Sequence, residues 1–243
     1  MRLPRLFVDM ALHGGQRISL PPASVTYLIQ VLRLRAGDEL LLFNGCGQDF
    51  PAQVVMAHRQ GAEVRLGAPG PLEPPLALRV HLGLGISKGD RMDYALQKAV
   101  ELGVAAITPL FTGRGVVRLE AQRLDKRHDH WRGVVIAACE QSGRRRPPPL
   151  HAVMDLSAWL AQDHPCPLLL DHRASQSLPS LAPPGPALTL LIGSEGGLAP
   201  PERDQALQAG FRGVRLGPRI LRSETAPLAA LAIAQALWGD LRD

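Results

Sequence analysis

Two segments near the C-terminus contain residue types that could bind and activate a small molecule. In the segment 190–202, LLIGSEGGLAPPE, an apolar run stops at Gly193 and a glutamate sits in a glycine-rich bend before two prolines. Glycine lets backbone approach a ligand closely, and the free N–H groups at a helix start favour an anion or polar atoms. The segment 214–225, VRLGPRILRSET, interleaves apolar side chains with Arg222 and Glu224. Backbone donors beside apolar side chains suit a flat aromatic ring such as adenine.

The elements that must position these segments alternate between strands and helices. Apolar runs predict strands at LALRVHLGLGI, VAAITPLF, CPLLLD, ALTLLIG and FRGVRLG. Helices are predicted at 87–103, 120–143 and 200–209, with a closing helix from about Thr225, and Ser87 and Asp90 stand at capping spacing in the first of them. This alternation predicts an α/β domain whose parallel sheet is covered by helices. Ligands bind at the carboxyl ends of such strands, which is where both segments begin.

The chain before this domain has a different pattern. Residues 1–72 are predicted to form a small β-rich domain with one helix, and a Pro/Gly stretch separates them from the α/β domain, residues 73–243. Asn44-Gly45 supplies the turn of a predicted hairpin between two apolar runs. Apolar residues at helical spacing predict that the one helix ends near Gly37.

The composition is that of an ordinary globular protein with an excess of arginine. The formal charge is +5, and only three of 27 basic residues are lysines; arginine forks suit phosphate recognition, but the charge alone leaves the partner open. Three cysteines lie far apart and eight histidines show no ligand spacing, so we expect neither a disulfide framework nor a metal. No run approaches the roughly 20 apolar residues of a membrane span, and the N-terminus lacks a signal core. We therefore expect a cytoplasmic protein.

Other common site motifs fail on spacing. GLGISKG at 83–89 has neither the dinucleotide fingerprint nor the phosphate-loop pattern, and GSEGG lacks the spacing of a nucleophile elbow. We interpret His172 beside Asp171 as a strand-end pair rather than a catalytic dyad. A nicotinamide dehydrogenase is accordingly disfavoured.

The segment LLIGSEGGLAPPE, followed by ALQAGFRGVRLGPRILRSETAPLAALA, closely resembles the signature of the ribosomal RNA small subunit methyltransferase E family, in the SPOUT superfamily. Matches at HLGLGISKGDRMDYALQKAVELGVAAITPLFTGR, WRGVVIAACEQSGRRRPP, LPRLFV and VLRLRAGDELLLFNGCG extend the resemblance over nearly the whole chain. Ser194 departs from the usual proline, a change we expect to be harmless because only backbone shape is involved. The other departures are Gly113 and Gly115, in place of Glu and Ser, and Thr26 and Gln30, in place of His and Arg. The two N-terminal changes remove side chains that could contact RNA.

The resemblance implies a PUA-like RNA-binding β-barrel at the N-terminus and an α/β SPOUT domain whose end forms a deep trefoil knot. It implies a homodimer, S-adenosylmethionine as methyl donor, and methylation of N3 of a uridine in 16S rRNA during small-subunit maturation. The last helix independently favours a second subunit, because only Gln235 is polar between Ala226 and Trp238. The implied cofactor-binding residues are Leu170, Ile192, Gly193, Glu195, Gly196, Gly197, Leu216, Gly217, Ile220, Leu221 and Arg222.

Residue roles follow as hypotheses. Arg222 is our first choice for a cation that stabilises the uracil as its N3 proton leaves. Glu224 either accepts that proton or caps the helix at Thr225, and we favour the cap. Glu195 either balances the sulfonium charge or holds the turn through backbone bonds. Predicted RNA contacts are Arg2, Arg5, Arg33 and Arg35 on the small domain and Arg144, Arg145 and Arg146 in GRRRPPP, where the alternative is a solvated charge run.

Two other functions stay open at this point. The first is a different SPOUT activity, 2′-O-ribose methylation, which uses the same knot and the same donor. The second is a non-catalytic RNA-binding or ribosome-assembly factor that kept the fold. Retention of both loop segments disfavours the second, since RNA binding alone needs no adenine pocket.

Overall fold

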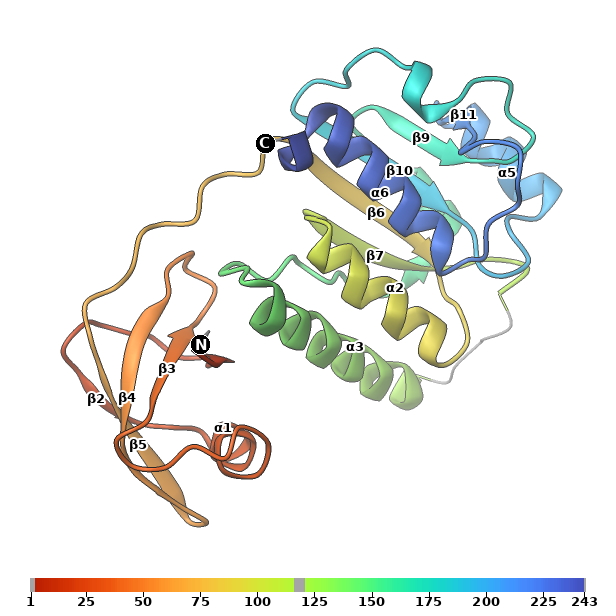
Figure 1. Ribbon diagram of the computed structural model, residues 1–243. Helices are drawn as coiled ribbons and strands as arrows, with labels where there is room; N and C mark the ends of the chain where they lie inside the picture. The colour runs from red at the N-terminus through yellow and green to blue at the C-terminus, as the bar shows by residue number, and fades with distance from the viewer. Residues whose placement is uncertain (1–2, 116–120, 243) are drawn as a thin grey trace. The chain divides into compact units, whose positions relative to one another are not determined.

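The computed structural model describes residues 3–115 and 121–242, which divide into two compact units (Figure 1). The first unit extends to Pro74 and also contains the segment Cys139–Pro147. The second contains Pro75–Ala138 and the chain from Pro148 onward. The predicted boundary after residue 72 lies close to the division at Pro74, but the sequence did not predict the return of residues 139–147.

The first unit is built on a five-stranded sheet in the order β1-β3-β4-β5-β2. β1 pairs parallel with β3, whereas the other pairs are antiparallel. Alternate residues of β4 and β5 are buried, because successive side chains of a strand point to opposite faces. The β3–β4 pairing across Asn44-Gly45 confirms the predicted hairpin. The strands are β1 (Arg5–Phe7), β2 (Arg17–Ser19), β3 (Glu39–Phe43), β4 (Phe50–His58) and β5 (Gly61–Leu66).

The predicted helix of the first unit is shorter than expected. α1 (Pro22–Thr26) continues into a π-helical turn, η1 (Tyr27–Val31), so the expected end near Gly37 is wrong. Arg33 has a φ of 56°, in the left-handed region that a side chain rarely adopts. The amide of Leu34 donates to the carbonyl of Leu28 at 3.1 Å, and the Leu34 side chain packs against the core. The helix thus ends before Gly37, and the partly buried Leu34 packs against the core from the segment that follows.

The second unit contains a six-stranded sheet in the order β11-β9-β10-β6-β7-β8, in which every pairing is parallel. This confirms the predicted parallel sheet. The central strands are buried along their length, as expected for strands that are covered on both faces. The strands are β6 (Arg79–Gly85), β7 (Ala106–Phe111), β8 (Met154–Asp155), β9 (Pro167–Leu170), β10 (Ala187–Ile192) and β11 (Arg212–Val214).

Helices cover both faces of this sheet (Figure 1). α2 and α6 contact each other on one face, and α4 and α5 contact each other with Trp159 in their shared apolar cluster. The predicted side-chain cap of α2 is wrong: its N-cap is Gly89, and no side chain accepts a capping hydrogen bond. The helices are α2 (Asp90–Glu101), α3 (Ala121–Ser142), α4 (Leu156–Leu160), α5 (Pro200–Gln208) and α6 (Thr225–Trp238), with short 3-10 turns η2 (Leu178–Ser180) and η3 (Asp240–Arg242). No helix within the described ranges is long and apolar enough to cross a membrane.

A cluster of charged residues, here called the Asp49 clasp, fastens the returning segment within the first unit. Buried Arg5 donates to the carbonyl oxygen of Cys139 at 2.5 Å and to Oδ1 of Asp49 at 2.7 Å. Arg145 donates from Nε to Oδ2 of the same carboxylate at 2.8 Å. Arg146 donates to the carbonyl oxygen of Glu73 at 2.9 Å. The clasp comprises Arg5, Asp49, Glu73, Arg145 and Arg146.

Candidate functional site

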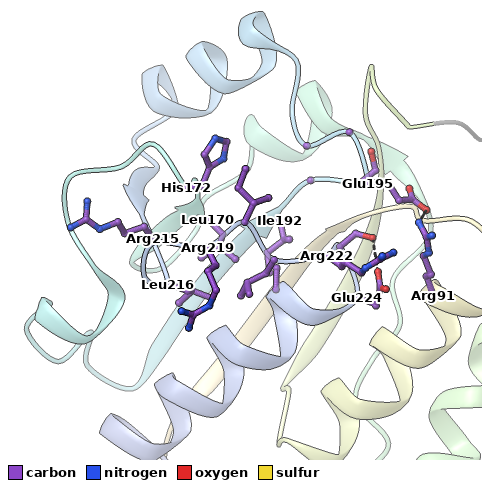
Figure 2. Close-up of a pocket in the computed structure, with 18 of the residues that line it drawn as sticks. Arg91, Leu170, His172, Ile192, Glu195, Arg215, Leu216, Arg219, Arg222 and Glu224 are labelled. Atoms are coloured by element: carbon purple, nitrogen blue, oxygen red, sulfur yellow. Dashed lines mark hydrogen bonds and ion pairs between the residues drawn. The ribbon is translucent and has the colours of Figure 1, made fainter.

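A cavity of about 370 Å³ lies at the carboxyl ends of β9, β10 and β11 (Figure 2). Its walls come mainly from the loops that follow these three strands, which is where the sequence placed the site. All of the predicted cofactor-binding residues line it, and so does Glu224. The predicted residues brought together are Leu170, Ile192, Gly193, Glu195, Gly196, Gly197, Leu216, Gly217, Ile220, Leu221, Arg222 and Glu224.

The turn after β10 leaves no room for side chains at its start. A Cβ on Gly193 would lie 2.6 Å from the backbone carbon of Gly197, so the turn closes tightly only because residue 193 is glycine. The amide of Gly197 donates to the carbonyl of Ser194 at 2.8 Å. The side chain of Ser194 is buried, and its Oγ lies 3.2 Å from Oγ1 of Thr112. Ser194 therefore contributes a side-chain hydrogen bond as well as backbone shape, which we did not expect.

Glu195 ties this turn to the loop between β6 and α2. Its Oε1 accepts a hydrogen bond from the amide of Lys88 at 2.8 Å and lies 3.6 Å from Nη1 of Arg91. Its Oε2 is buried and has no hydrogen-bond partner among the described residues. The bond from Lys88 is a backbone bond, as one of the two predicted roles requires, but it joins the turn to another loop. Oε2 is left for a ligand, and both predicted roles of Glu195 stay predictions.

Arg222 and Glu224 lie next to each other at the cavity, in the last of the three loops (Figure 2). Glu224 occupies the N-cap position of α6, but its side chain makes no capping hydrogen bond. The cap that we favoured is therefore wrong. The reason is that the amides of Thr225 and Ala226 both donate to the carbonyl of Arg222, at 3.0 and 2.9 Å. The carboxylate of Glu224 instead accepts from Oγ of Ser223 at 3.2 Å.

Several residues of the cavity were not predicted from the sequence. Arg91 reaches it from α2, and its only sequence signal is its place in the helix after GLGISKG. His172 lies two residues after Leu170, and Arg219 directly precedes Ile220. Their closeness to predicted cofactor-binding residues is the only sequence signal for them. The remaining unpredicted lining residues are Ser194, Arg215, Ser223 and Ala226.

The predicted RNA-binding arginines fall into separate groups. Arg33 and Arg35 are exposed and line a shallow cavity of the first unit together with Gln30. Arg5 is only 6% exposed and, like Arg145 and Arg146, belongs to the Asp49 clasp. Arg144 is half-buried beside the clasp, and Arg2 lies outside the described residues.

The departures from the family pattern also have defined surroundings. Oγ1 of Thr26 donates to the carbonyl of Pro22 within the first helix, at 3.2 Å. The amide of Gly113 donates to Oε1 of Glu202 at 2.6 Å, and that of Gly115 donates to the carbonyl of Thr112 at 2.9 Å. No group of three or more metal-binding side chains is present in the part of the chain that the structure describes.

Comparisons with known proteins identify the class. The family model for an RNA methyltransferase domain matches residues 74–235, and that for an RNA methyltransferase PUA domain matches residues 20–67. Together with the parallel sheet and its loop-lined cavity, these matches define an RNA methyltransferase with a PUA-like domain. The trefoil knot stays a prediction.

Individual relatives narrow the class to one family. A ribosomal RNA small subunit methyltransferase E from Buchnera aphidicola is 34% identical over 99% of this chain and 98% of its own length. The crystal structure of such an enzyme from Neisseria gonorrhoeae, bound to S-adenosyl methionine, is 39% identical with a TM-score of 0.94, over 99% of this chain and 100% of its own. A putative methyltransferase from Legionella pneumophila, in complex with the same cofactor, is 34% identical with a TM-score of 0.95, over 99% and 100%. The chain belongs to the ribosomal RNA small subunit methyltransferase E family.

Proposed function

We propose that the protein transfers a methyl group from S-adenosylmethionine to N3 of a uridine in 16S rRNA. Its family membership makes it an rRNA methyltransferase that uses S-adenosylmethionine, and the proposal adds the acceptor atom and the residue roles. The observation that carries it is the convergence of the loops after β9, β10 and β11 on one cavity of about 370 Å³.

The residues of this cavity fit the cofactor. The side chains of Leu170, Ile192 and Leu216 offer apolar surface beside the backbone of the 193–197 turn, as a flat adenine ring requires. The orphaned Oε2 of Glu195 is compatible with a cationic ligand, because a buried carboxylate oxygen without a partner is costly. When bound, S-adenosylmethionine supplies the methyl group and the sulfonium from which it departs.

The chain's own contribution to the chemistry is orientation and proton handling. The uracil N3 carries a proton on its Watson–Crick edge, so the base must be unpaired and turned outward before N3 can react. We assign Arg222 the role of a fixed cation that stabilises the negative charge of the uracil as this proton leaves. Glu224 makes no capping bond, so its carboxylate is available to accept the proton. The three loops supply the remaining rate enhancement by aligning the methyl donor with the acceptor nitrogen.

Arg222→Ala tests this assignment. We expect kcat to fall by about 100-fold, because one preorganised charge is removed from the developing anion. The affinity for S-adenosylmethionine, measured by calorimetry, should change by less than threefold. A parallel fall in affinity and rate would instead make Arg222 a cofactor-binding residue.

The apolar face of α6 is the basis for a proposal about the protein's oligomeric state. α6 leaves Leu228, Ala232 and Ile233 only partly buried and Leu237 exposed in a single chain, although the helix is almost entirely apolar. We assign this face to a second copy of the protein, because a monomer would expose it to water. Ile233→Glu should lower the mass measured by light scattering from that of a dimer to that of a monomer. An unchanged dimer mass would move the interface elsewhere.

For RNA, we propose that Arg33 and Arg35 contact the phosphate backbone, and we assign Arg5, Arg145 and Arg146 to the Asp49 clasp instead. Arg33 and Arg35 are exposed, and their guanidinium groups have no ion-pair partner in the described part of the chain. We place this activity in the cytoplasm, where ribosomal subunits are assembled.

The decisive experiment uses small ribosomal subunits that lack the modification. These are incubated with the protein and labelled S-adenosylmethionine, and the RNA is digested so that nucleosides are identified by mass. Labelled 3-methyluridine is the expected product. Label on ribose would replace the N3 assignment with 2′-O-methylation, and absence of both label and cofactor binding would leave an RNA-binding assembly factor.

A further inference from the structure

A second, smaller cavity lies beside the cofactor cavity and is lined by three arginines. It has a volume of about 130 Å³ and shares Leu170, His172, Gly193, Gly196 and Gly197 with the larger cavity, so the two have a common wall. Its other lining residues include Arg114 from the loop after β7, Arg173 from the loop after β9, and Arg203 from α5. We call it the arginine cavity.

Arg114 is held against the turn that forms the wall. Its Nη1 donates to the carbonyl of Gly196 at 3.1 Å. A Cβ on Gly196 would lie 2.8 Å from Cβ of Arg114, so the arginine packs directly on the glycine. Glu202 fixes the neighbouring backbone, because its Oε1 accepts from Gly113 at 2.6 Å and its Oε2 accepts from Ala199 at 2.8 Å. The position of Arg114 is thus tied to that of the cofactor-binding turn.

Asp171 orients the other two arginines. Its carboxylate accepts from Nε of Arg173 at 3.0 Å and from Nε of Arg203 at 2.5 Å, and its Oδ1 also accepts from the amide of Arg173 at 3.0 Å. Burial acts to raise the pKa of Asp171, but the hydrogen bonds from Arg203 and Arg173 outweigh it and hold the pKa at about 2. The carboxylate is therefore ionised, and both of its oxygens are occupied.

The arrangement leaves guanidinium donors for a ligand. Both arginines bind Asp171 through Nε, and the Nη atoms of Arg173 have no protein acceptor within the described ranges. Nη1 of Arg203 lies 3.6 Å from the exposed carboxylate of Asp204, which does not line the cavity. Among the lining side chains, three arginines and one aspartate leave a net charge of +2. Preoriented guanidinium forks of this kind bind phosphate and carboxylate groups.

We propose that the arginine cavity binds a backbone phosphate of the RNA next to the nucleotide that is methylated. The inference rests on the proposed function, since it takes the adjoining cavity to hold the methyl donor. A phosphate bound on the far side of the common wall would fix the RNA chain relative to the 193–197 turn, and so would help to place the target base. The carboxylate of the cofactor is the other anion that could reach these donors, and the experiment separates the two.

The test compares the double variant Arg114→Gln/Arg173→Gln with Arg212→Gln. Arg212 is an exposed arginine at the amino end of β11, whereas the cavities lie at the carboxyl ends of the strands. In the double variant Asp171 keeps Arg203, so the fold should persist, which circular dichroism checks. We expect the KM for small-subunit RNA to rise about tenfold or more with kcat within about threefold of wild type, because charged hydrogen bonds to the substrate are lost. The affinity for S-adenosylmethionine should fall by no more than about fivefold, which is the share of the lost hydrogen bond from Arg114 to Gly196.

The salt dependence of RNA binding provides a readout that does not need catalysis. The slope of log K against log salt should become shallower by about 0.7 in the double variant, as for one lost contact to a single-stranded phosphate. A KM and a slope equal to those of Arg212→Gln would overturn the proposal. An affinity for S-adenosylmethionine that is weaker by well over tenfold, with the salt slope unchanged, would assign the cavity to the cofactor. If wild-type protein transfers no methyl group to N3, the proposed function fails while the salt slopes still decide on the arginine cavity.

Discussion

Replacing Arg5 with Met should strongly destabilise the first unit. Arg5 is 6% exposed, and its guanidinium donates to the carbonyls of Cys139 and Arg144, at 2.5 and 3.0 Å, as well as to Asp49 at 2.7 Å. It also lies 4.4 Å from the centre of the Phe43 ring. Methionine keeps the apolar stem as far as the place of Nε, but it carries no charge over the ring and donates no hydrogen bond. The variant therefore removes the guanidinium and retains most of the buried stem.

The magnitude follows from the groups that would lose a partner. Each of the two carbonyls loses a charged donor at a cost of about 1–2 kcal/mol, although that of Cys139 keeps the amide of Gly143 at 3.1 Å. Asp49 would lose one cation but keep Arg145 at 2.8 Å, so its share should stay near 1 kcal/mol rather than the larger penalty of a lone buried charge. The free energy of opening of the first unit should fall by about 3–5 kcal/mol in total.

Hydrogen exchange followed by mass spectrometry measures this change where it occurs. Peptides from β1 and β3 report on the first unit, whereas Trp131, Trp159 and Trp238 all belong to the second, so tryptophan emission follows only that unit. The matched control is Arg17→Met. Arg17 pairs with Glu63 on the surface of the same sheet, with side chains 54% and 29% exposed, and its loss should cost less than about 1 kcal/mol.

Equal loss of protection in the two variants would refute the reasoning, because burial of the ion pair would then have no effect. A second outcome would also contradict it. If Arg5→Met kept full protection and bound RNA more weakly, Arg5 would act as the RNA contact that the sequence first suggested.

Two further changes test the second unit. Gly193→Ala places a Cβ 2.6 Å from the backbone of Gly197 and should weaken S-adenosylmethionine binding by about 10–100-fold in calorimetry, whereas Gly133→Ala in α3, with nothing within 4 Å, should not. Burial, together with the charges of His151 and His164, lowers the pKa of His81 from 6.5 to about 4, so the folded state favours the neutral ring. As the pH falls from 6.5 to 4, His81 becomes protonated in the unfolded chain but stays neutral in the folded protein. The free energy of unfolding should therefore decrease by about 1–2 kcal/mol after allowance for solvent screening. His81→Gln should flatten this part of a stability curve followed by tryptophan emission; an unchanged slope would exclude His81 as its source.

The strands were predictable because their patterns are local. A short apolar run such as LTLLI is typical of a central strand in a parallel sheet, and β10 is buried along almost its whole length. The order of the strands was not predictable, because β11 lies beside β9 through pairings that no local pattern records. The early end of the first helix is accompanied by packing of the partly buried Leu34 against the core, which is likewise a tertiary contact.

The site was predictable where it is built from loops with their own chemistry. The glycines of the 193–197 turn mark close backbone approach, and the three loops meet because carboxyl ends of parallel strands share one edge. Arg91 was not predicted because its place at the cavity depends on its contact with Glu195, which lies far away in the sequence. The cap at Glu224 was wrongly expected because the sequence does not reveal that the carbonyl of Arg222 already accepts the first amides of α6.

The return of residues 139–147 makes the first unit a discontinuous domain, and this limits how the protein can be divided. The chain passes between the two units after Pro74, after Ala138 and after Pro147. A protease that cut only the Pro/Gly stretch would leave both pieces associated, because α3 still carries the second part of the first unit. A fragment that stopped at Pro74 would lack Arg145 and Arg146. It would also lack the carbonyl of Cys139, which accepts a hydrogen bond from Arg5. The first unit is therefore not a separable N-terminal extension, because the end of α3 and the segment after it complete its fold.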